Sequence, residues 1–132
     1  GPESRYGHYY DQVRGLLVNP YNENYYNSTS KAAPTYFFDA ETGAALTNQF
    51  FNWEGDWYYF GPDGKALIFD QVINGQHLYF RNNGKQVKGQ FISDYKGTRY
   101  YDENSGELVT NQTRTINGVT YLFDENGRPT QL

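Results

Sequence analysis

The sequence predicts an all-β protein, a β-solenoid of stacked short β-hairpin repeats of about 21 residues. Two observations carry this prediction: aromatic clusters recur at nearly constant spacing, and glycine-containing turns recur in phase with them. Aromatic rings must supply much of the core, because 14 Tyr, 9 Phe and 2 Trp stand in a 132-residue chain whose hydrophobic fraction is only 37%. Disordered segments are poor in aromatic residues, so this composition favours a folded chain.

The repeat is marked by a cluster of three residues rich in rings, and the last residues of successive clusters are 22, 20, 21 and 22 positions apart. The clusters stand at residues 36–38, 58–60, 78–80, 99–101 and 121–123. A turn glycine follows each cluster, at Gly43, Gly64, Gly84, Gly106 and Gly127. A glutamine then opens the next unit, at Gln49, Gln71, Gln90 and Gln112.

A second set of turns precedes the later clusters, at residues 54–55, 74–75, 96–97 and 117–118, each ending in glycine. Glycine adopts positive φ at little cost, and Asn-Gly between apolar residues is a strong signal for a hairpin. Each unit is therefore predicted to contain two or three short strands. A single hairpin cannot bury its rings alone, so neighbouring units are expected to stack. No helix is expected.

The N-terminal part, residues 1–34, is predicted to be a divergent first repeat at 8–19 followed by an insertion loop. Residues 8–11 and 15–19 line up with 99–102 and 106–110 of a later unit. Gly1-Pro2 is typical of the scar that a protease leaves after cleaving a tag, so the native termini are expected to lie outside this sequence. Residues 35–132 are predicted to form five stacked repeats, the last one partial.

Strand side chains alternate between two faces, which assigns the rings to an inner and an outer set. The last cluster residues and the apolar residues of the following strand are expected to point inward: Phe38, Phe60, Phe80, Tyr101 and Phe123, with Leu46, Leu67, Val87 and Val109. The middle cluster residues are expected to point outward: Phe37, Tyr59, Tyr79, Tyr100 and Leu122.

Tyr79, Gln86 and Lys88 are expected to share the outward face of one unit. A Tyr ring can cover the C–H face of a pyranose, while Gln and Lys supply donors and an acceptor for its hydroxyls. The same residues fit a structural alternative, in which Tyr79 packs on a neighbouring repeat and the stem of Lys88 covers it. Trp57 and Tyr59 form a second candidate platform, although cross-strand packing also accounts for Trp57.

Several function classes are disfavoured. The net charge of −4 without a run of Lys or Arg argues against nucleic acid, and no apolar stretch is long enough for membrane insertion. The chain has no cysteine, hence no thiolate metal site. Four aspartates, Asp39, Asp63, Asp102 and Asp124, stand beside turn glycines, where Asp serves the backbone. No enzyme activity, cofactor or metal is expected.

Residues 73–80 and 83–89 closely resemble the glucan-binding repeats of secreted glucansucrases, and 116–124 resembles a further copy. The resemblance covers about 8–19 and 35–132 and is most specific within 71–127. In that family a stacking ring joins a Gln-x-Lys pair, which Gln86 and Lys88 match. Tyr79 is the nearest ring, His77 lies two residues before it, and Tyr100 or Tyr95 of the neighbouring repeat is a second candidate to close the pocket.

The resemblance implies a non-catalytic module that binds α-glucan such as dextran, or isomaltooligosaccharides, and holds it near the catalytic domain of its parent chain. It also implies a secreted protein, extracellular or associated with the cell wall. Three alternatives stay open. The first is a repeat of the clostridial toxin type, which shares the ring clusters and binds cell-surface oligosaccharide. The second is a choline-binding repeat, which shares Trp57-Tyr58-Tyr59 but carries Met and a Gly-Trp pair that this chain lacks. The third is a structural spacer or self-association module, which would bind no ligand.

Overall fold

The computed structural model describes residues 16–18 and 34–132. Of the predicted first repeat at 8–19, only the strand Leu16–Val18 lies within these residues, and the insertion predicted at 20–34 lies outside them except for Pro34.

The described residues form eleven strands and no helix, which confirms the all-β prediction. They accordingly contain no helix able to cross a membrane. The strands are β1 (Leu16–Val18), β2 (Tyr36–Phe38), β3 (Gln49–Trp53), β4 (Asp56–Phe60), β5 (Phe69–Ile73), β6 (Gln76–Phe80), β7 (Gln90–Asp94), β8 (Gly97–Tyr101), β9 (Gln112–Ile116), β10 (Val119–Phe123) and β11 (Pro129–Gln131).

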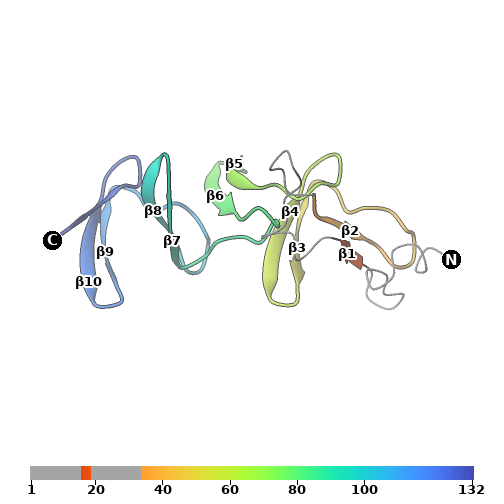
Figure 1. Ribbon diagram of the computed structural model, residues 1–132, viewed down its shortest axis with the longest axis horizontal. Coiled ribbons are helices and arrows are strands. Elements are labelled where there is room, and N and C mark those ends of the chain that lie inside the picture. Colours follow the sequence, from red (N-terminus) through yellow and green to blue (C-terminus); the bar gives the residue numbers. More distant parts are fainter. Residues whose placement is uncertain (1–15, 19–33) are drawn as a thin grey trace. The chain divides into compact units, whose positions relative to one another are not determined.

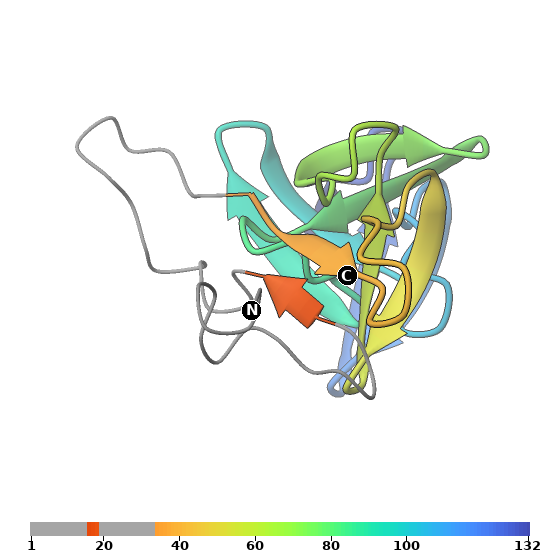
Figure 2. The ribbon, with the colours of Figure 1, turned by 90° about the vertical axis from the view of Figure 1, so that its right-hand side faces the viewer.

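The strands pair in small sheets, mostly two-stranded hairpins (Figure 1). Strands β3–β4, β5–β6, β7–β8 and β9–β10 are such hairpins, and β11 adds a third strand beside β10. Strands β1 and β2 also pair antiparallel, with Leu17 opposite Phe37 (red and orange in Figure 2). The hairpins predicted from the glycine turns are therefore confirmed.

Two of the hairpin turns have the conformation predicted from their Asn-Gly sequences, and a third turn differs. Asn74-Gly75 and Asn117-Gly118 have φ of 52° and 79°, and of 52° and 82°, the two positive values that a type I′ turn requires. In β7–β8 the turn residues are instead Tyr95 and Lys96, and the positive φ of 99° falls on Gly97, the first residue of β8. This turn is thus shifted by one residue from the predicted pair 96–97.

The glutamine predicted to open each unit is the first residue of β3, β7 and β9. The repeat that contains β5 differs, because β5 begins at Phe69, two residues before the predicted Gln71. Gln71 lies only three positions before the turn residue Asn74, whereas Gln49 lies five positions before the turn residue Glu54. The strand must therefore begin upstream of Gln71 to reach five residues.

Successive repeats are joined by backbone hydrogen bonds. The amide of the second residue after a turn glycine donates to a carbonyl of the preceding repeat, from Ala66 to Thr35 (2.8 Å) and from Gln86 to Trp57 (2.8 Å). Leu108 donates in the same way to His77 (2.9 Å). The segment after each cluster therefore connects one repeat to the preceding one by a hydrogen bond. This explains why the cluster and the glycine recur together.

The described chain divides into two compact units. The first comprises the described residues up to Phe69 together with Phe80–Gln86, and the second comprises Asp70–Tyr79 and Val87–Leu132. The core of the first unit contains Phe37, Tyr58, Phe60 and Ala66, against which Leu46, Phe51 and Trp53 pack. The second unit has two clusters, one of Tyr79, Val87, Ile92 and Tyr101 and one of Tyr100, Val109 and Phe123.

The inward prediction is confirmed for most of its members. Phe60, Phe80, Tyr101 and Phe123 are at most 1% exposed, whereas Phe38 is half-buried. On the following strand Val87 and Val109 are buried, and Leu46 and Leu67 are half-buried.

The outward prediction is wrong at Phe37, Tyr79 and Tyr100, which are only 4%, 9% and 5% exposed. It holds at Leu122, which is 47% exposed, while Tyr59 is half-buried. The alternation assumed one wet face per hairpin. A two-stranded hairpin between two neighbours instead loses both faces to packing, and Tyr79 illustrates this, because its ring centroid lies 5.7 Å from that of Tyr101 in the next repeat.

Candidate functional site

Of the residues predicted to bind sugar, Trp57 and Gln86 are brought together in the first unit. Gln86 donates its backbone N–H to the carbonyl oxygen of Trp57 at 2.8 Å. Gln86 is half-buried, and Trp57 is 40% exposed. The backbones of a partly exposed tryptophan and a half-buried glutamine are thus joined in this unit.

Adjacent residues hold this pair in place. Asp56 precedes Trp57 and Lys85 precedes Gln86, and their side chains form an ion pair, with 3.6 Å from Lys85 Nζ to Asp56 Oδ2. This pair is exposed, so its contribution to stability is small, at most about 1 kcal/mol. The backbone hydrogen bond beside it determines the position of Gln86.

The turn that leads to Gln86 is tightly packed. Asn83 is 1% exposed, its Oδ1 accepts the backbone N–H of Lys85 at 3.0 Å, and its carbonyl oxygen accepts the hydroxyl of Thr35 at 2.9 Å. Gly84 has φ of 92°, and a Cβ there would lie 2.8 Å from the Cβ of Ala66. Asn83 and Gly84 therefore serve to place Gln86 against the preceding repeat.

Tyr59 shares a face of β4 with Trp57 but is less available. Its ring meets that of Phe50, across the hairpin, with a centroid distance of 4.8 Å and an interplanar angle of 75°. Edge-on pairing of this kind stabilises the hairpin and orients the ring. Trp57 is the more open part of the predicted platform.

The remaining predicted residues lie in the second unit. Tyr79 packs on Tyr101, and the guanidinium carbon of Arg99 lies 5.9 Å from its ring centroid. Tyr100 packs on Phe91, with a centroid distance of 4.9 Å, and burial raises the pKa of its hydroxyl. Both rings present little surface to a ligand, in line with the structural alternative of packing between repeats.

Lys88 and His77 are the polar members of this set. The Lys88 ammonium donates to the carbonyl oxygen of Asn104 at 3.1 Å. His77 is exposed, and its carbonyl oxygen accepts the amide of Leu108. Gln86 belongs to the first unit and Lys88 to the second.

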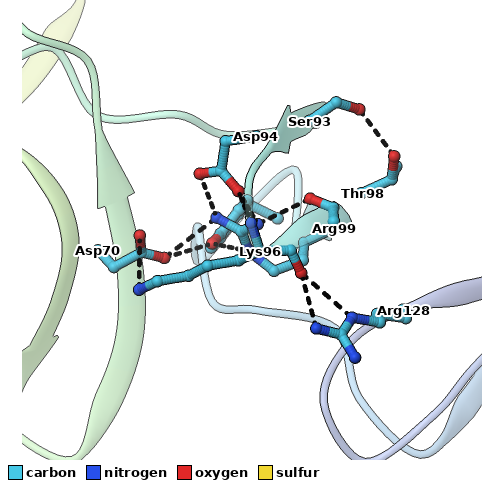
Figure 3. Close-up of polar contacts among 9 residues, drawn as sticks. Asp70, Ser93, Asp94, Lys96, Thr98, Arg99 and Arg128 are labelled. Carbon is cyan, nitrogen blue, oxygen red and sulfur yellow. Dashed lines mark hydrogen bonds and ion pairs between the residues drawn. The ribbon is translucent and has the colours of Figure 1, made fainter.

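Sequence reasoning missed Arg99 as the centre of a polar cluster (Figure 3). Its side chain is 5% exposed and makes hydrogen bonds from all three nitrogens. Nη1 donates to Asp94 Oδ1 (2.7 Å) and Gly97 O (2.8 Å), Nη2 to Asp94 Oδ2 (3.1 Å) and Asp70 Oδ1 (3.2 Å), and Nε to the Tyr101 hydroxyl (3.2 Å). All five N–H donors are therefore used.

The electrostatics of this cluster are those of a paired buried charge. Hydrogen bonding to Asp94 raises the pKa of Arg99, and the same bond lowers the pKa of the Asp94 carboxyl. Hydrogen bonding to Asp70 raises the pKa of Lys96, whose ammonium lies 3.2 Å from Asp70 Oδ2. The signal in the sequence was a single arginine at a cluster position where other repeats carry Tyr or Leu, five residues after an aspartate.

Comparison with known proteins places these repeats in a family. The sequence model of the choline-binding repeat matches residues 71–112, and that of a cell wall binding repeat matches residues 48–66. The chain is 45% identical over 101 residues to Glucosyltransferase-I of Streptococcus downei, which spans 75% of this chain and 6% of that protein. It is 42% identical over 119 residues to Glucosyltransferase-S of Streptococcus mutans, spanning 88% of this chain and 7% of that protein.

Solved structures agree on the fold. Alternansucrase in complex with isomaltononaose matches with a TM-score of 0.59 and 28% identity, over 88% of this chain and 9% of that one. Choline binding protein F of Streptococcus pneumoniae matches with a TM-score of 0.63 and 23% identity, over 89% of this chain and 35% of that one. At that identity the second match bears on the fold alone.

The chain spans less than a tenth of the glucosyltransferases it matches. The matched segments belong to the binding repeats of those proteins and not to their catalytic domain. The chain therefore contains repeats of the choline-binding and cell wall binding type and is related to the repeats of streptococcal glucosyltransferases.

Proposed function

We propose that these repeats bind α-glucan chains without turning them over, and that the first unit carries one sugar site at Trp57 and Gln86. The observation that carries the proposal is that Trp57, 40% exposed, is joined to Gln86 by a backbone hydrogen bond of 2.8 Å. The relatives are glucosyltransferases, and a structural neighbour is named as a complex with isomaltononaose, an α-glucan oligosaccharide.

The chemistry of the pair suits a glucosyl ring. An indole covers the C–H face of a pyranose by apolar burial and dispersion. A primary amide has two donors and an acceptor, so Gln86 can bind two neighbouring hydroxyls. Lys88 belongs to the second unit, where its ammonium donates to the carbonyl oxygen of Asn104, and Tyr79 and Tyr100 contribute through packing. One ring and a few polar groups give weak binding in a shallow site.

We further propose that the five repeats of residues 35–132 stack as a β-solenoid attached to the catalytic domain of a longer parent chain. Such a chain would act outside the cell or at the cell wall and keep polymer close to the enzyme. Several weak sites along one polymer bind far more tightly together than singly, because each later contact is intramolecular. Weak sites repeated along a solenoid could therefore hold a long glucan tightly.

Choline is the second candidate ligand, because the choline-binding repeat matches residues 71–112. A quaternary ammonium requires a cage of exposed aromatic faces. The rings of Tyr58, Tyr79, Tyr100 and Tyr101 are all at most 9% exposed, so none of these four offers a face to such a cage. The geometry therefore favours a stacked sugar over a caged cation.

Tryptophan fluorescence tests the proposal. The chain has two Trp, and Trp53→Phe leaves Trp57 as the single indole reporter. Trp53 packs on Phe37 at 5.2 Å, so Phe is a conservative replacement. Titration of this variant with isomaltotriose is expected to give a saturable change in emission, in the high micromolar to millimolar range typical of one shallow site.

Variants and other ligands define the outcome. Gln86→Ala is expected to weaken the response, and Tyr79→Phe, which keeps the packed ring, is expected to leave it unchanged. A response to choline and none to isomaltotriose would make the repeats choline binders. Silence towards both, and towards a cell-surface oligosaccharide of the toxin-repeat type, would make this segment a spacer.

A further inference from the structure

The second unit contains a pocket of about 570 Å³ that no sequence motif indicated. This volume lies within the range of about 300 to 1,000 Å³ of small-molecule sites. It is lined by the polar cluster of Asp70, Arg99 and Tyr101, here called its floor, and by a second group here called its rim: Val72, Leu108, Thr110, Glu125, Asn126 and Arg128. All lining residues belong to the second unit.

A change of two side chains accounts for the open space. In two other repeats a tyrosine and an alanine pack under the turn glycine of the next repeat: a Cβ on Gly64 would meet Ala45 and Tyr36, and one on Gly84 would meet Ala66 and Tyr58. The corresponding residues beneath Gly127 are Leu108 and Arg99, and the nearest atoms there all belong to Leu108. Arg99 is drawn instead towards Asp94 and Asp70, and the place of the ring remains open.

The charged side chains in the floor of the pocket are paired with one another. Every N–H of Arg99 is already bonded, and Lys96 lies 3.2 Å from Asp70 Oδ2. The Tyr101 hydroxyl is held between Arg99 and Asp70. A ligand would therefore meet a surface whose charges are paired before it arrives.

The rim supplies the groups that remain available. Among the described residues, the hydroxyl of Thr110, the carboxylate of Glu125 and the amide of Asn126 have no side-chain hydrogen bond or ion pair, and each of them lines the pocket. Arg128 donates from Nε and Nη2 to the carbonyl oxygen of Lys96, at 3.1 and 2.9 Å, which leaves Nη1 unused (Figure 3).

The rim is also held in position. Asp124 Oδ1 accepts the backbone N–H groups of Asn126 and Arg128 at 2.8 and 2.9 Å, which closes the turn. A Cβ on Gly127 would lie 2.7 Å from Leu108 Cδ1, so the turn packs closely on Leu108. Glu125 and Asn126 are thus presented by a fixed turn beside an apolar side chain.

We infer that this pocket is a second saccharide site, one that binds a neutral glucosyl unit through hydrogen bonds from its rim rather than through a stacked ring. This inference rests on the proposed function. A carboxylate and an amide can accept and donate to neighbouring hydroxyls, Arg128 and Thr110 add donors, and Leu108 and Val72 offer apolar surface to ring C–H groups.

Other ligand classes fit less well. Of the two rings that line the pocket, that of Tyr101 is 1% exposed, and the exposed imidazole of His77 alone forms no cage for choline. Asp70 and Asp94 pair with Lys96 and Arg99, and Glu125 offsets Arg128, so the pocket offers an anion no excess of positive charge. Among the described residues no group of three His, Cys, Asp or Glu side chains could hold a metal ion. A hydroxyl-rich neutral ligand uses both the donors and the acceptors of the rim.

The test is a ¹H–¹⁵N NMR titration of the chain with isomaltotriose, in the Trp57→Ala background that removes the ring of the first site. Saturable shifts of the amides of residues 108–110 and 125–128 are expected. Glu125→Ala is expected to raise the dissociation constant for these shifts at least about fivefold, the loss of a charged hydrogen bond. The matched control is Glu103→Ala, at the equivalent turn position after Asp102, which should leave it unchanged.

The outcomes separate the inference from the proposed function. In the chain with Trp57 unchanged, shifts confined to the amides near Trp57 and Gln86 would overturn the pocket site and leave the proposed function standing. Silence at both places would overturn both. Pocket shifts induced by choline and not by isomaltotriose, or shifts insensitive to Glu125→Ala, would also refute a saccharide site on this rim.

Discussion

Replacing Asp94 by Ala is expected to cost more stability than replacing Arg99 by Leu, although the second change removes more hydrogen bonds. Asp94→Ala takes away two charge-assisted bonds, at 2.7 and 3.1 Å, and leaves a guanidinium that is 5% exposed. Removing one partner of a buried ion pair costs about 3 to 5 kcal/mol. We expect about 3 kcal/mol, because Asp70 remains 3.2 Å away.

Arg99→Leu leaves no orphaned buried charge. The side chains of Asp94 and Asp70 are 24% and 34% exposed, so both carboxylates can be hydrated once the guanidinium is gone. Leu is also the residue at the equivalent position 78, where it is 2% exposed. Exchanging a buried ion pair for a hydrophobic residue is often nearly neutral, and we expect a loss of about 1 kcal/mol.

Two further variants isolate the charge. Asp94 also accepts the backbone N–H of Lys96 at 2.9 Å, so Asp94→Asn, which can keep this turn bond, should cost less than Asp94→Ala. In the Arg99→Leu background, Asp94→Ala should cost only the turn bond, about 1 kcal/mol. The coupling between the two sites is therefore about 2 kcal/mol.

Urea unfolding followed by circular dichroism measures these differences, and amide hydrogen exchange in β7 and β8 assigns them to this hairpin. Exchange is needed because repeat proteins can open locally. The reasoning is refuted if Arg99→Leu is as costly as Asp94→Ala, or if Asp94→Ala costs the same in both backgrounds.

Two other changes are predicted. Gly84→Ala should destabilise the chain by at least about 2 kcal/mol in urea unfolding, since its Cβ would lie 2.8 Å from Ala66 Cβ and 3.1 Å from Tyr58 Cδ2. The control is Gly75→Ala, which should cost about 1 kcal/mol, because Gly75 has φ of 79° and a Cβ there would meet nothing within 4 Å. Equal losses in the two variants would contradict the packing argument. Backbone N–H groups of Ser105 and Asn104 lower the pKa of Asp102 to about 2 from 3.8. Its contribution, at most about 2 kcal/mol, should be present above pH 4 and lost as the pH falls to 2, and Asp102→Asn should flatten acid unfolding over this window.

The sequence allowed the repeat, the hairpins and their turns to be predicted, because these depend on local chemistry. Asn74-Gly75 forms the hairpin turn expected of it, with positive φ at both residues. The same reasoning misplaced the turn of β7–β8 by one residue, since Lys96 has neither the flexibility of Gly nor the αL tolerance of Asn. There the positive φ passes to Gly97 alone.

The faces of the rings were harder to predict, because burial depends on neighbouring units. Period-two alternation separates two faces of a strand but does not say whether the second face meets water. Tyr79 was expected to face a ligand, yet it packs on Tyr101 and Val87 of the second unit's core. Trp57 lies two residues before Tyr59, which corresponds to Tyr79 in its own repeat. It keeps 40% of its surface exposed.

Near-identical repeats need not carry equivalent sites, and the position shared by Tyr58 and Arg99 shows why. A tyrosine there lies beneath the next turn glycine and fills the gap between repeats, as Tyr58 does beneath Gly84. An arginine of similar length is held aside by carboxylates at Asp94 and Asp70, and a pocket of about 570 Å³ lies beside it. The backbone of both repeats is the same hairpin. The space between repeats along such a chain can therefore change through one buried cluster residue and its acidic partners, while the hydrogen bonds that join the repeats stay in place.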